Sequence, residues 1–96
     1  MLDKNPDWHL YMILTKTGAL YTGITTDVAR RFQEHKDTYA QLPNAKGAKY
    51  FRGNQPDKIV YQETHTDRSA ASRRERAIKA MTKQQKLDLI NHNKPV

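Results

Sequence analysis

The sequence predicts a mixed α/β fold of the α+β type, with a small, largely antiparallel three-stranded sheet flanked by helices. Strand-forming residues fill three short segments, at residues 8–14, 19–24 and 58–63. A turn with a glycine joins the first two segments, and capping residues mark the starts of three helices. The resulting order is strand, strand, helix, strand, helix, helix. A chain of 96 residues has room for one core, so we expect a single domain over residues 1–96 with its core at about 8–90.

The first two strands are expected to form an antiparallel hairpin. If residues 16–18 form a three-residue loop, with Gly18 free to adopt positive φ, Tyr11 faces Gly23 across the hairpin. Because side chains alternate along a strand, this register places Tyr11, Tyr21 and Gly23 on one face. A glycine opposite a tyrosine leaves a hollow beside the phenol hydroxyl.

The first helix is expected to begin after residues 25–27, which supply a capping hydroxyl or carboxylate, and to end at about Lys36. Val28 and Phe32 should pack inward. Residues 37–56 contain two prolines and two glycines and are predicted to form a long irregular connection. This connection carries a basic run interleaved with aromatic residues, namely Lys46, Lys49, Tyr50, Phe51 and Arg52.

Two further helices follow the third strand. The first is capped at residues 66–67 and runs to about Ala80. Its apolar residues are Ala70, Ala71, Ala77, Ile78 and Met81. The last helix starts with a capping box over residues 82–85 and buries Leu87 and Ile90.

Composition and charge exclude several classes of protein. Cysteine is absent, which excludes a disulfide scaffold, a cysteine zinc site and a thiol nucleophile. The polar residues 1–6 lack the apolar core of a signal peptide and no long apolar run follows, so we expect a cytoplasmic protein without membrane contact. Residues 1–48 carry six basic and five acidic side chains, whereas residues 49–96 carry eleven and five. This skew indicates a surface for polyanions, although basic helices that serve only solubility give the same pattern.

The common catalytic motifs are missing. The sequence has no phosphate-binding glycine loop, no hydrolase nucleophile elbow, no histidine spacing typical of zinc and no closely paired carboxylates. Arg31 and His35 stand four residues apart and therefore share one helix face. Glu75 lies at the edge of an apolar helix stripe, where its carboxylate needs a cation or another partner. A salt bridge between Glu75 and Arg31 is the structural alternative to a catalytic role.

The order of these residues resembles the GIY-YIG nuclease superfamily. The first motif stands here as His9-Leu10-Tyr11 and the second as Tyr21-Thr22-Gly23, and the second tyrosine follows the first by ten positions. Arg31, eight residues past the glycine, stands where the family has a catalytic arginine, and His35 follows four residues later. The metal-binding glutamate of the family matches Glu75.

Two departures from the family pattern concern its first glycine and its late asparagine. The first motif lacks the initial glycine, and Asn91 is only the nearest candidate for the asparagine. The resemblance covers about residues 8–90. The chain is therefore similar to the small, single-domain bacterial members of the superfamily. It implies a nuclease that hydrolyses DNA phosphodiester bonds with one Mg²⁺ or Mn²⁺ ion, in a context such as DNA repair or recombination.

The resemblance also implies the roles of individual residues. The catalytic set is Tyr11, Tyr21, Arg31, His35 and Glu75, with Glu75 also the metal ligand and Gly23 structural. A tyrosine accepts the proton of the attacking water, and Tyr11 is the first choice for this role. We further expect a monomer without a small-molecule cofactor. The residues expected to contact the phosphates of bound DNA are Lys49, Arg52, Arg73, Arg74 and Arg76. A non-catalytic nucleic-acid-binding module with the same fold is the alternative that the sequence leaves open.

Overall fold

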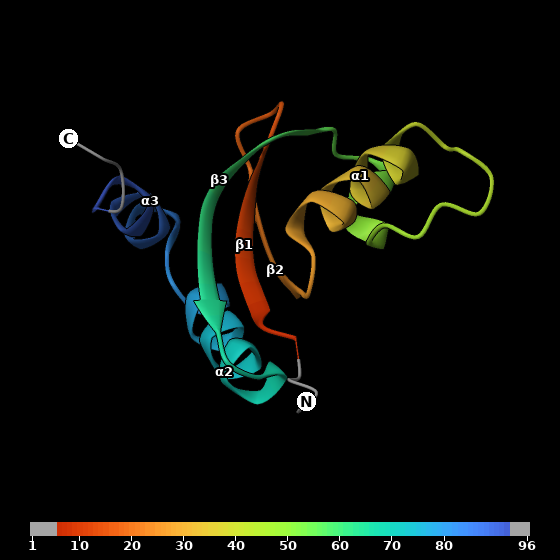
Figure 1. Ribbon diagram of the computed structural model, residues 1–96. Coiled ribbons are helices and arrows are strands. Elements are labelled where there is room, and N and C mark those ends of the chain that lie inside the picture. The colour runs from red at the N-terminus through yellow and green to blue at the C-terminus, as the bar shows by residue number, and fades with distance from the viewer. Residues whose placement is uncertain (1–5, 93–96) are drawn as a thin grey trace, which may run out of the picture.

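The computed structural model describes residues 6–92 and confirms the predicted fold class and order of elements (Figure 1). Its elements are β1 (Trp8–Thr15), β2 (Leu20–Thr25), α1 (Val28–Tyr39), the short 3₁₀ helix η1 (Lys49–Arg52), β3 (Pro56–His65), α2 (Arg68–Lys79) and α3 (Lys83–His92). Within the described range, no helix combines the length and apolar character needed to cross a membrane.

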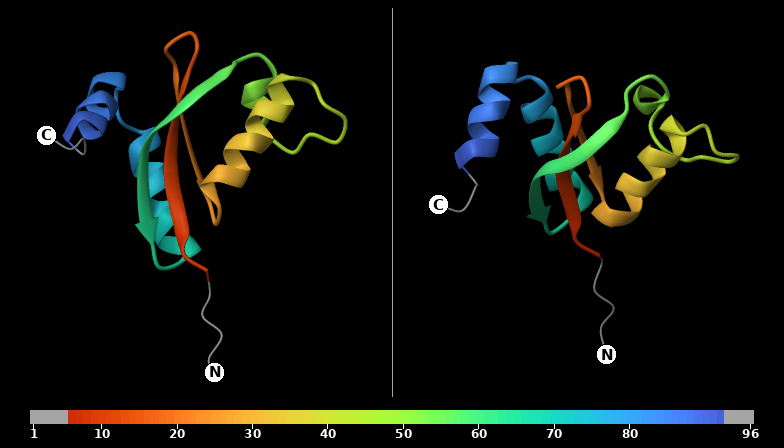
Figure 2. Two further views of the ribbon diagram at one scale, coloured as in Figure 1. Left: turned by 45° about the horizontal axis from the view of Figure 1, so that its top comes forward. Right: turned by 90° about the horizontal axis from the view of Figure 1, so that it is seen from above.

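The sheet separates two groups of helices. Its strand order is β2-β1-β3, and both pairs are antiparallel, so β1 is central and β2 is an edge strand. Figure 2 shows α1 and η1 on one face of the sheet and α2 and α3 on the other. Leu10 and Met12 pack with residues of α2 and α3, whereas Tyr11 and Ile13 pack toward α1 and η1. The alternation of side chains along β1 therefore divides the core into two layers.

Both layers are filled as the apolar pattern predicts, with one exception. Val28 and Phe32 pack against the layer that contains Tyr11, and Leu87 and Ile90 belong to the opposite layer. The exception is Ala77, an apolar residue of the second helix that is exposed. The buried residues Ala71 and Ile78 are seven apart and define the inward face of α2. Six residues after Ala71 the helix has turned Ala77 well away from that face.

The hairpin has the predicted register. Tyr11 pairs with Gly23, and Ile13 pairs with Tyr21, so these side chains share the α1 face of the sheet. The three-residue loop is closed by the backbone hydrogen bond from Thr15 to Ala19, at 2.9 Å. Gly18 adopts φ of 91°, a conformation that is costly for residues with a Cβ atom.

The predicted helix caps are confirmed. Asp27 caps α1 through the backbone N–H of Arg30, at 3.0 Å, and Asp67 caps α2 in the same way. The residues of the predicted capping box, Thr82 and Gln85, bond each other's backbone N–H groups.

The predicted irregular connection was too long at both ends. The first helix continues to Tyr39 because no breaking residue precedes Pro43, and the buried Thr38 anchors its last turn. Pro56 opens β3, a position where a proline loses no ladder bond inside the strand. Within the connection, residues 49–52 form η1 and bury Phe51.

Candidate active site

Tyr11 occupies the centre of the site and needs Gly23 opposite it. The tyrosine is 1 % exposed, and its hydroxyl reaches past the backbone of β2. A Cβ atom at Gly23 would lie 2.5 Å from Tyr11 Oη and 2.7 Å from Cζ. Residue 23 must therefore be a glycine to leave room for the Tyr11 side chain. This room is the hollow beside the phenol hydroxyl that the hairpin register predicts.

His35 forms hydrogen bonds both with Tyr11 and with the segment that follows α1. Its Nε2 lies 2.8 Å from Tyr11 Oη, and its Nδ1 lies 3.1 Å from the backbone nitrogen of Ala48. The ring is completely buried and packs on Phe51, with centroids 4.3 Å apart. Burial and, secondarily, the positive charge of Arg31 lower the pKa of His35 to about 4. His35 is therefore neutral near pH 7.

Arg31 lies one turn before His35 on the same face of α1. Its Nη1 bonds Glu34 Oε1 at 2.9 Å and the backbone oxygen of Lys46 at 2.8 Å. Burial lowers the pKa of Arg31, but hydrogen bonding to Glu34 and the neighbouring Tyr11 together raise it above its ordinary value. The guanidinium is therefore a fixed positive charge beside the Tyr11 hydroxyl.

Aromatic side chains surround the second tyrosine of the pair. The ring of Tyr21 lies 6.3 Å from that of Tyr11, 5.4 Å from His35 and 4.7 Å from Phe51, measured between centroids. The partly exposed Tyr50 covers Tyr21 from outside at 5.3 Å. These contacts restrict both tyrosines to one arrangement at the β2 edge of the sheet.

Glu75 approaches the same site from α2. Its charge raises the pKa of both Tyr11 and Tyr21, so its carboxylate acts across the edge strand on both phenols. Among residues 6–92 its ionic partner is Lys79, whose Nζ lies 3.2 Å from Oε2. The alternative salt bridge to Arg31 is not formed, because Arg31 bonds Glu34 on its own helix instead.

Both tyrosines are phenols in the resting protein. Burial is the largest cause that raises the pKa of Tyr11, followed by the neighbouring Tyr21, while Arg31 opposes the shift by charge and hydrogen bonding. Burial also raises the pKa of Tyr21, with Lys79 and Arg31 opposing it. The site thus places two cations where they favour a phenolate, against the effect of burial.

This ordered set of two tyrosines, an arginine, a histidine and a glutamate at one sheet edge agrees with a known family. The family profile described as the GIY-YIG catalytic domain matches residues 7–88. The chain belongs to the GIY-YIG family. Its fold is accordingly of the nuclease type.

Three similar proteins agree with this assignment. A UPF0213 protein of Desulfotalea psychrophila is 46 % identical over 85 residues, which cover 88 % of this chain and 72 % of the relative. One from Photorhabdus laumondii is 46 % identical over 83 residues, covering 86 % and 73 %. The solution NMR structure of a UPF0213 protein from Bacillus halodurans aligns with a TM-score of 0.56 at 32 % identity, covering 91 % of this chain and 85 % of that one.

The family generally uses divalent metal ions, and Glu75 is chemically suited to hold one. Its side chain is 23 % exposed, and apart from Lys79 no described side chain forms an ion pair with it. No group of three or more His, Asp or Glu side chains within residues 6–92 could hold a metal alone. Magnesium needs no such cage, because one carboxylate suffices when water and a substrate phosphate complete its coordination. The residues present therefore fit a single magnesium or manganese ion.

The five predicted phosphate-contacting residues are not equivalent. Lys49 and Arg52 are exposed on η1, and Arg73 and Arg76 are exposed on α2. Arg74 differs, because its Nε and Nη2 each lie 2.9 Å from Glu63 Oε2. Its guanidinium is held by a carboxylate of β3, whereas Arg73 bonds the hydroxyl of Ser69 at 2.7 Å and, among residues 6–92, neither Arg73 nor Arg76 forms an ion pair.

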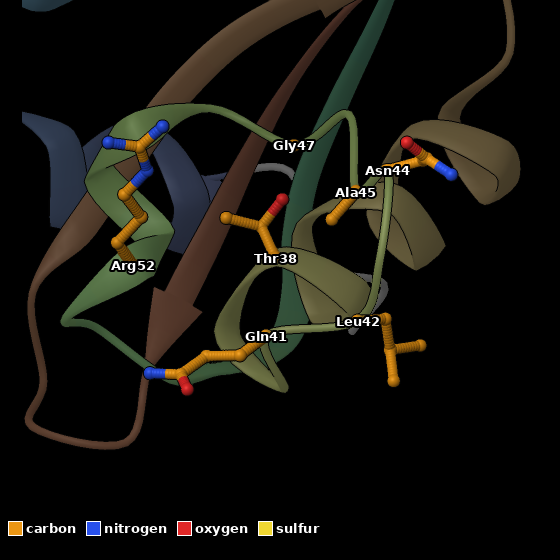
Figure 3. Close-up of a pocket in the computed structure, with 7 residues that line it drawn as sticks. All are labelled: Thr38, Gln41, Leu42, Asn44, Ala45, Gly47 and Arg52. Atoms are coloured by element: carbon orange, nitrogen blue, oxygen red, sulfur yellow. The ribbon is translucent and has the colours of Figure 1, made fainter.

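Lys79 and the loop before η1 also contribute to the site, although the sequence-based prediction did not include them. Lys79 follows Glu75 by four residues, a spacing that places both on one helix face and could have revealed the pair. The loop contributes backbone atoms of Lys46 and Ala48, which no sequence pattern reports. A separate pocket beside this loop contains Arg52 but none of the tyrosines (Figure 3); its lining is Thr38, Gln41, Leu42, Asn44, Ala45, Gly47 and Arg52.

Proposed function

We propose that this protein is a divalent-metal-dependent endonuclease that hydrolyses phosphodiester bonds of DNA. The observation that supports the proposal is the buried Tyr11 hydroxyl, which lies 2.8 Å from His35 Nε2 beside the Arg31 guanidinium, with Glu75 near enough that its charge raises the pKa of both tyrosines. A base, a fixed cation and a carboxylate with unused coordination capacity are what phosphodiester hydrolysis requires. Family membership adds a prior for the same reaction.

Arg31 stabilises the phosphate in this proposal. Its guanidinium has donors beyond those used by Glu34 and Lys46, and it presents them as a rigid fork to two phosphate oxygens. As the attacking water adds to phosphorus, negative charge grows on those oxygens and the fixed cation stabilises it.

Tyr11 accepts the proton of the attacking water. In the resting site it is a phenol, so its own proton must first pass to solvent water, and Arg31 stabilises the resulting phenolate. Glu75 would hold a divalent cation, which would supply positive charge to a phosphate and lower the pKa of a bound water. Tyr21 orients Tyr11 and lines the substrate side of the site. The exposed Lys49 and Arg52 of η1 and Arg73 and Arg76 of α2 bind the flanking DNA backbone.

A cleavage assay with defined substrates tests the proposal. Supercoiled plasmid, flap, branched and single-stranded DNA are incubated with Mg²⁺ or Mn²⁺, with and without chelator; the flap and branched forms represent repair and recombination intermediates. We expect cleavage that the chelator abolishes and that Tyr11→Phe lowers at least about 100-fold, the effect typical of a general base. A parent protein that binds these DNAs and cuts none of them would instead identify a binding module.

A further inference from the structure

The loop before η1 touches two of the proposed catalytic side chains through its backbone. The oxygen of Lys46 accepts a hydrogen bond from Arg31 Nη1 at 2.8 Å. Two residues later, the N–H of Ala48 donates to His35 Nδ1 at 3.1 Å. The segment Lys46–Gly47–Ala48, which we call the strap, therefore bonds both the Arg31 and the His35 side chain of α1.

Gly47 allows the strap to lie against α1. A Cβ atom there would stand 2.5 Å from the backbone oxygen of Glu34, 2.5 Å from Thr38 Oγ1 and 2.7 Å from the Cα of His35. Figure 3 shows the chain at Gly47 running beside the side chain of Thr38. Any larger residue would have to move the strap away from the helix, and the two hydrogen bonds would lengthen with it.

The strap also determines which nitrogen of His35 carries the proton. A backbone N–H can only donate, so Nδ1 must present its lone pair to Ala48. Since His35 is neutral, its single proton is then on Nε2, which lies 2.8 Å from Tyr11 Oη. His35 therefore donates a hydrogen bond to Tyr11 and does not accept the tyrosine's proton.

We propose that the strap is a positioning device, which fixes His35 as a hydrogen-bond donor to Tyr11 and holds Arg31 beside the same hydroxyl. A donor at Oη stabilises the phenolate that accepts a proton from water. The proton that Tyr11 loses beforehand goes to solvent water, since Nε2 already carries a hydrogen. The kinetic part of this inference rests on the proposed nuclease function, and the tautomer part does not.

Two glycine variants provide a matched test. Gly47→Ala introduces the three close contacts, whereas a Cβ atom at Gly53, which ends η1 in the same connection, meets nothing within 4 Å. The imidazole ¹⁵N chemical shifts of His35 report its tautomer without DNA or metal. We expect the Nε2–H tautomer in the parent and in Gly53→Ala, and a mixture of tautomers in Gly47→Ala.

Kinetics then separate positioning from general destabilisation. For Gly47→Ala we expect kcat to fall at least tenfold with KM nearly unchanged, and for Gly53→Ala we expect both to match the parent. Ala48→Pro is a second variant should Gly47→Ala not fold: φ at Ala48 is −63°, which proline adopts, and the donor to His35 is removed. It should show the same loss of tautomer and of kcat.

The outcomes distinguish the two proposals. An Nδ1–H tautomer in the parent, or a parental tautomer and kcat in both strap variants, would overturn the positioning role. A parent that shows the Nε2–H tautomer, loses it in Gly47→Ala and cuts no DNA would uphold the strap's effect on His35 while rejecting the nuclease function.

Discussion

The molecule contains two clusters of the same four residue types, and only one of them resembles an active site. On β3 and α2, Tyr61, His65 and Arg74 all bond the carboxylate of Glu63. At the β2 edge, Tyr11, His35 and Arg31 form their own contacts, and Glu75 is left with Lys79. The two carboxylates are similarly buried, with side chains 18 % and 23 % exposed.

The two glutamates differ in how far their carboxylate oxygens are already used in hydrogen bonds. Burial raises the pKa of Glu63, but hydrogen bonds from Tyr61, His65 and Arg74 outweigh it and hold this pKa below the ordinary value. Such a saturated carboxylate stabilises the fold by tying α2 to the sheet. Glu75 forms an ion pair with Lys79 alone among the described residues, and its charge acts on two phenols. Residue composition therefore does not distinguish the two clusters, whereas unused bonding capacity does.

Removing Arg31 should have the largest effect on the β2-edge cluster. Arg31→Ala loses the fixed cation, and we expect cleavage to slow by about 2.7–4 kcal/mol of transition-state stabilisation, that is, about 100- to 1000-fold. Arg31→Lys should rescue little, because an ammonium lacks the two-pronged geometry. Arg30→Ala is the matched control, since Arg30 is exposed and contacts Glu34 only at 3.9 Å. Equal cleavage rates for Arg31→Ala and Arg30→Ala would remove the assigned difference between them.

Acid should act on the β2-edge cluster through His35. Its pKa is about 4 when folded and near 6.5 when unfolded, so the unfolded chain binds more protons between these values. The free energy of unfolding should accordingly fall as the pH drops from about 6.5 to about 4, by about 2–3 kcal/mol in total. Chemical denaturation of the parent and of His35→Gln at several pH values measures this, with the variant expected to show a flatter profile. Identical profiles would mean that His35 is not buried in its neutral form.

The arginines of α2 allow a smaller test of the same contrast. Arg73→Ala or Arg76→Ala should each reduce the slope of log affinity against log salt by about 0.9, the value for one phosphate contact on duplex DNA. Arg74→Ala should change that slope less, because Glu63 already holds the guanidinium. Lys83→Ala on the distant α3 serves as the control. Salt titrations of DNA binding in which all four variants keep the parental slope would leave α2 without a role in binding.

The sequence predicts those parts of the site that depend on local geometry. The hairpin register that pairs Tyr11 with Gly23 follows from a three-residue turn, and the shared face of Arg31 and His35 follows from helical spacing. The caps at Asp27 and Asp67 are equally local. These features involve residues close in sequence, whose side-chain types carry the signal.

The remaining contacts depend on backbone groups or on distant pairings. Any residue can supply the oxygen at Lys46 or the N–H at Ala48, so the strap has no side-chain signature. Arg74 has the composition of a phosphate ligand, and only the packing of α2 against β3 shows that Glu63 holds it. For the same reason the sequence did not reveal that the chain has two clusters of similar composition.

The most direct measurement replaces each glutamate in turn by glutamine and records both metal-dependent nicking and the free energy of unfolding. Glu75→Gln should abolish nicking, because a neutral amide oxygen is a weak ligand for magnesium, while its unfolding free energy stays within about 1 kcal/mol of the parent. Glu63→Gln should lose about 1–3 kcal/mol of stability through its weakened hydrogen bonds, and its folded fraction should nick DNA at the parental rate. Full nicking by Glu75→Gln would contradict the account.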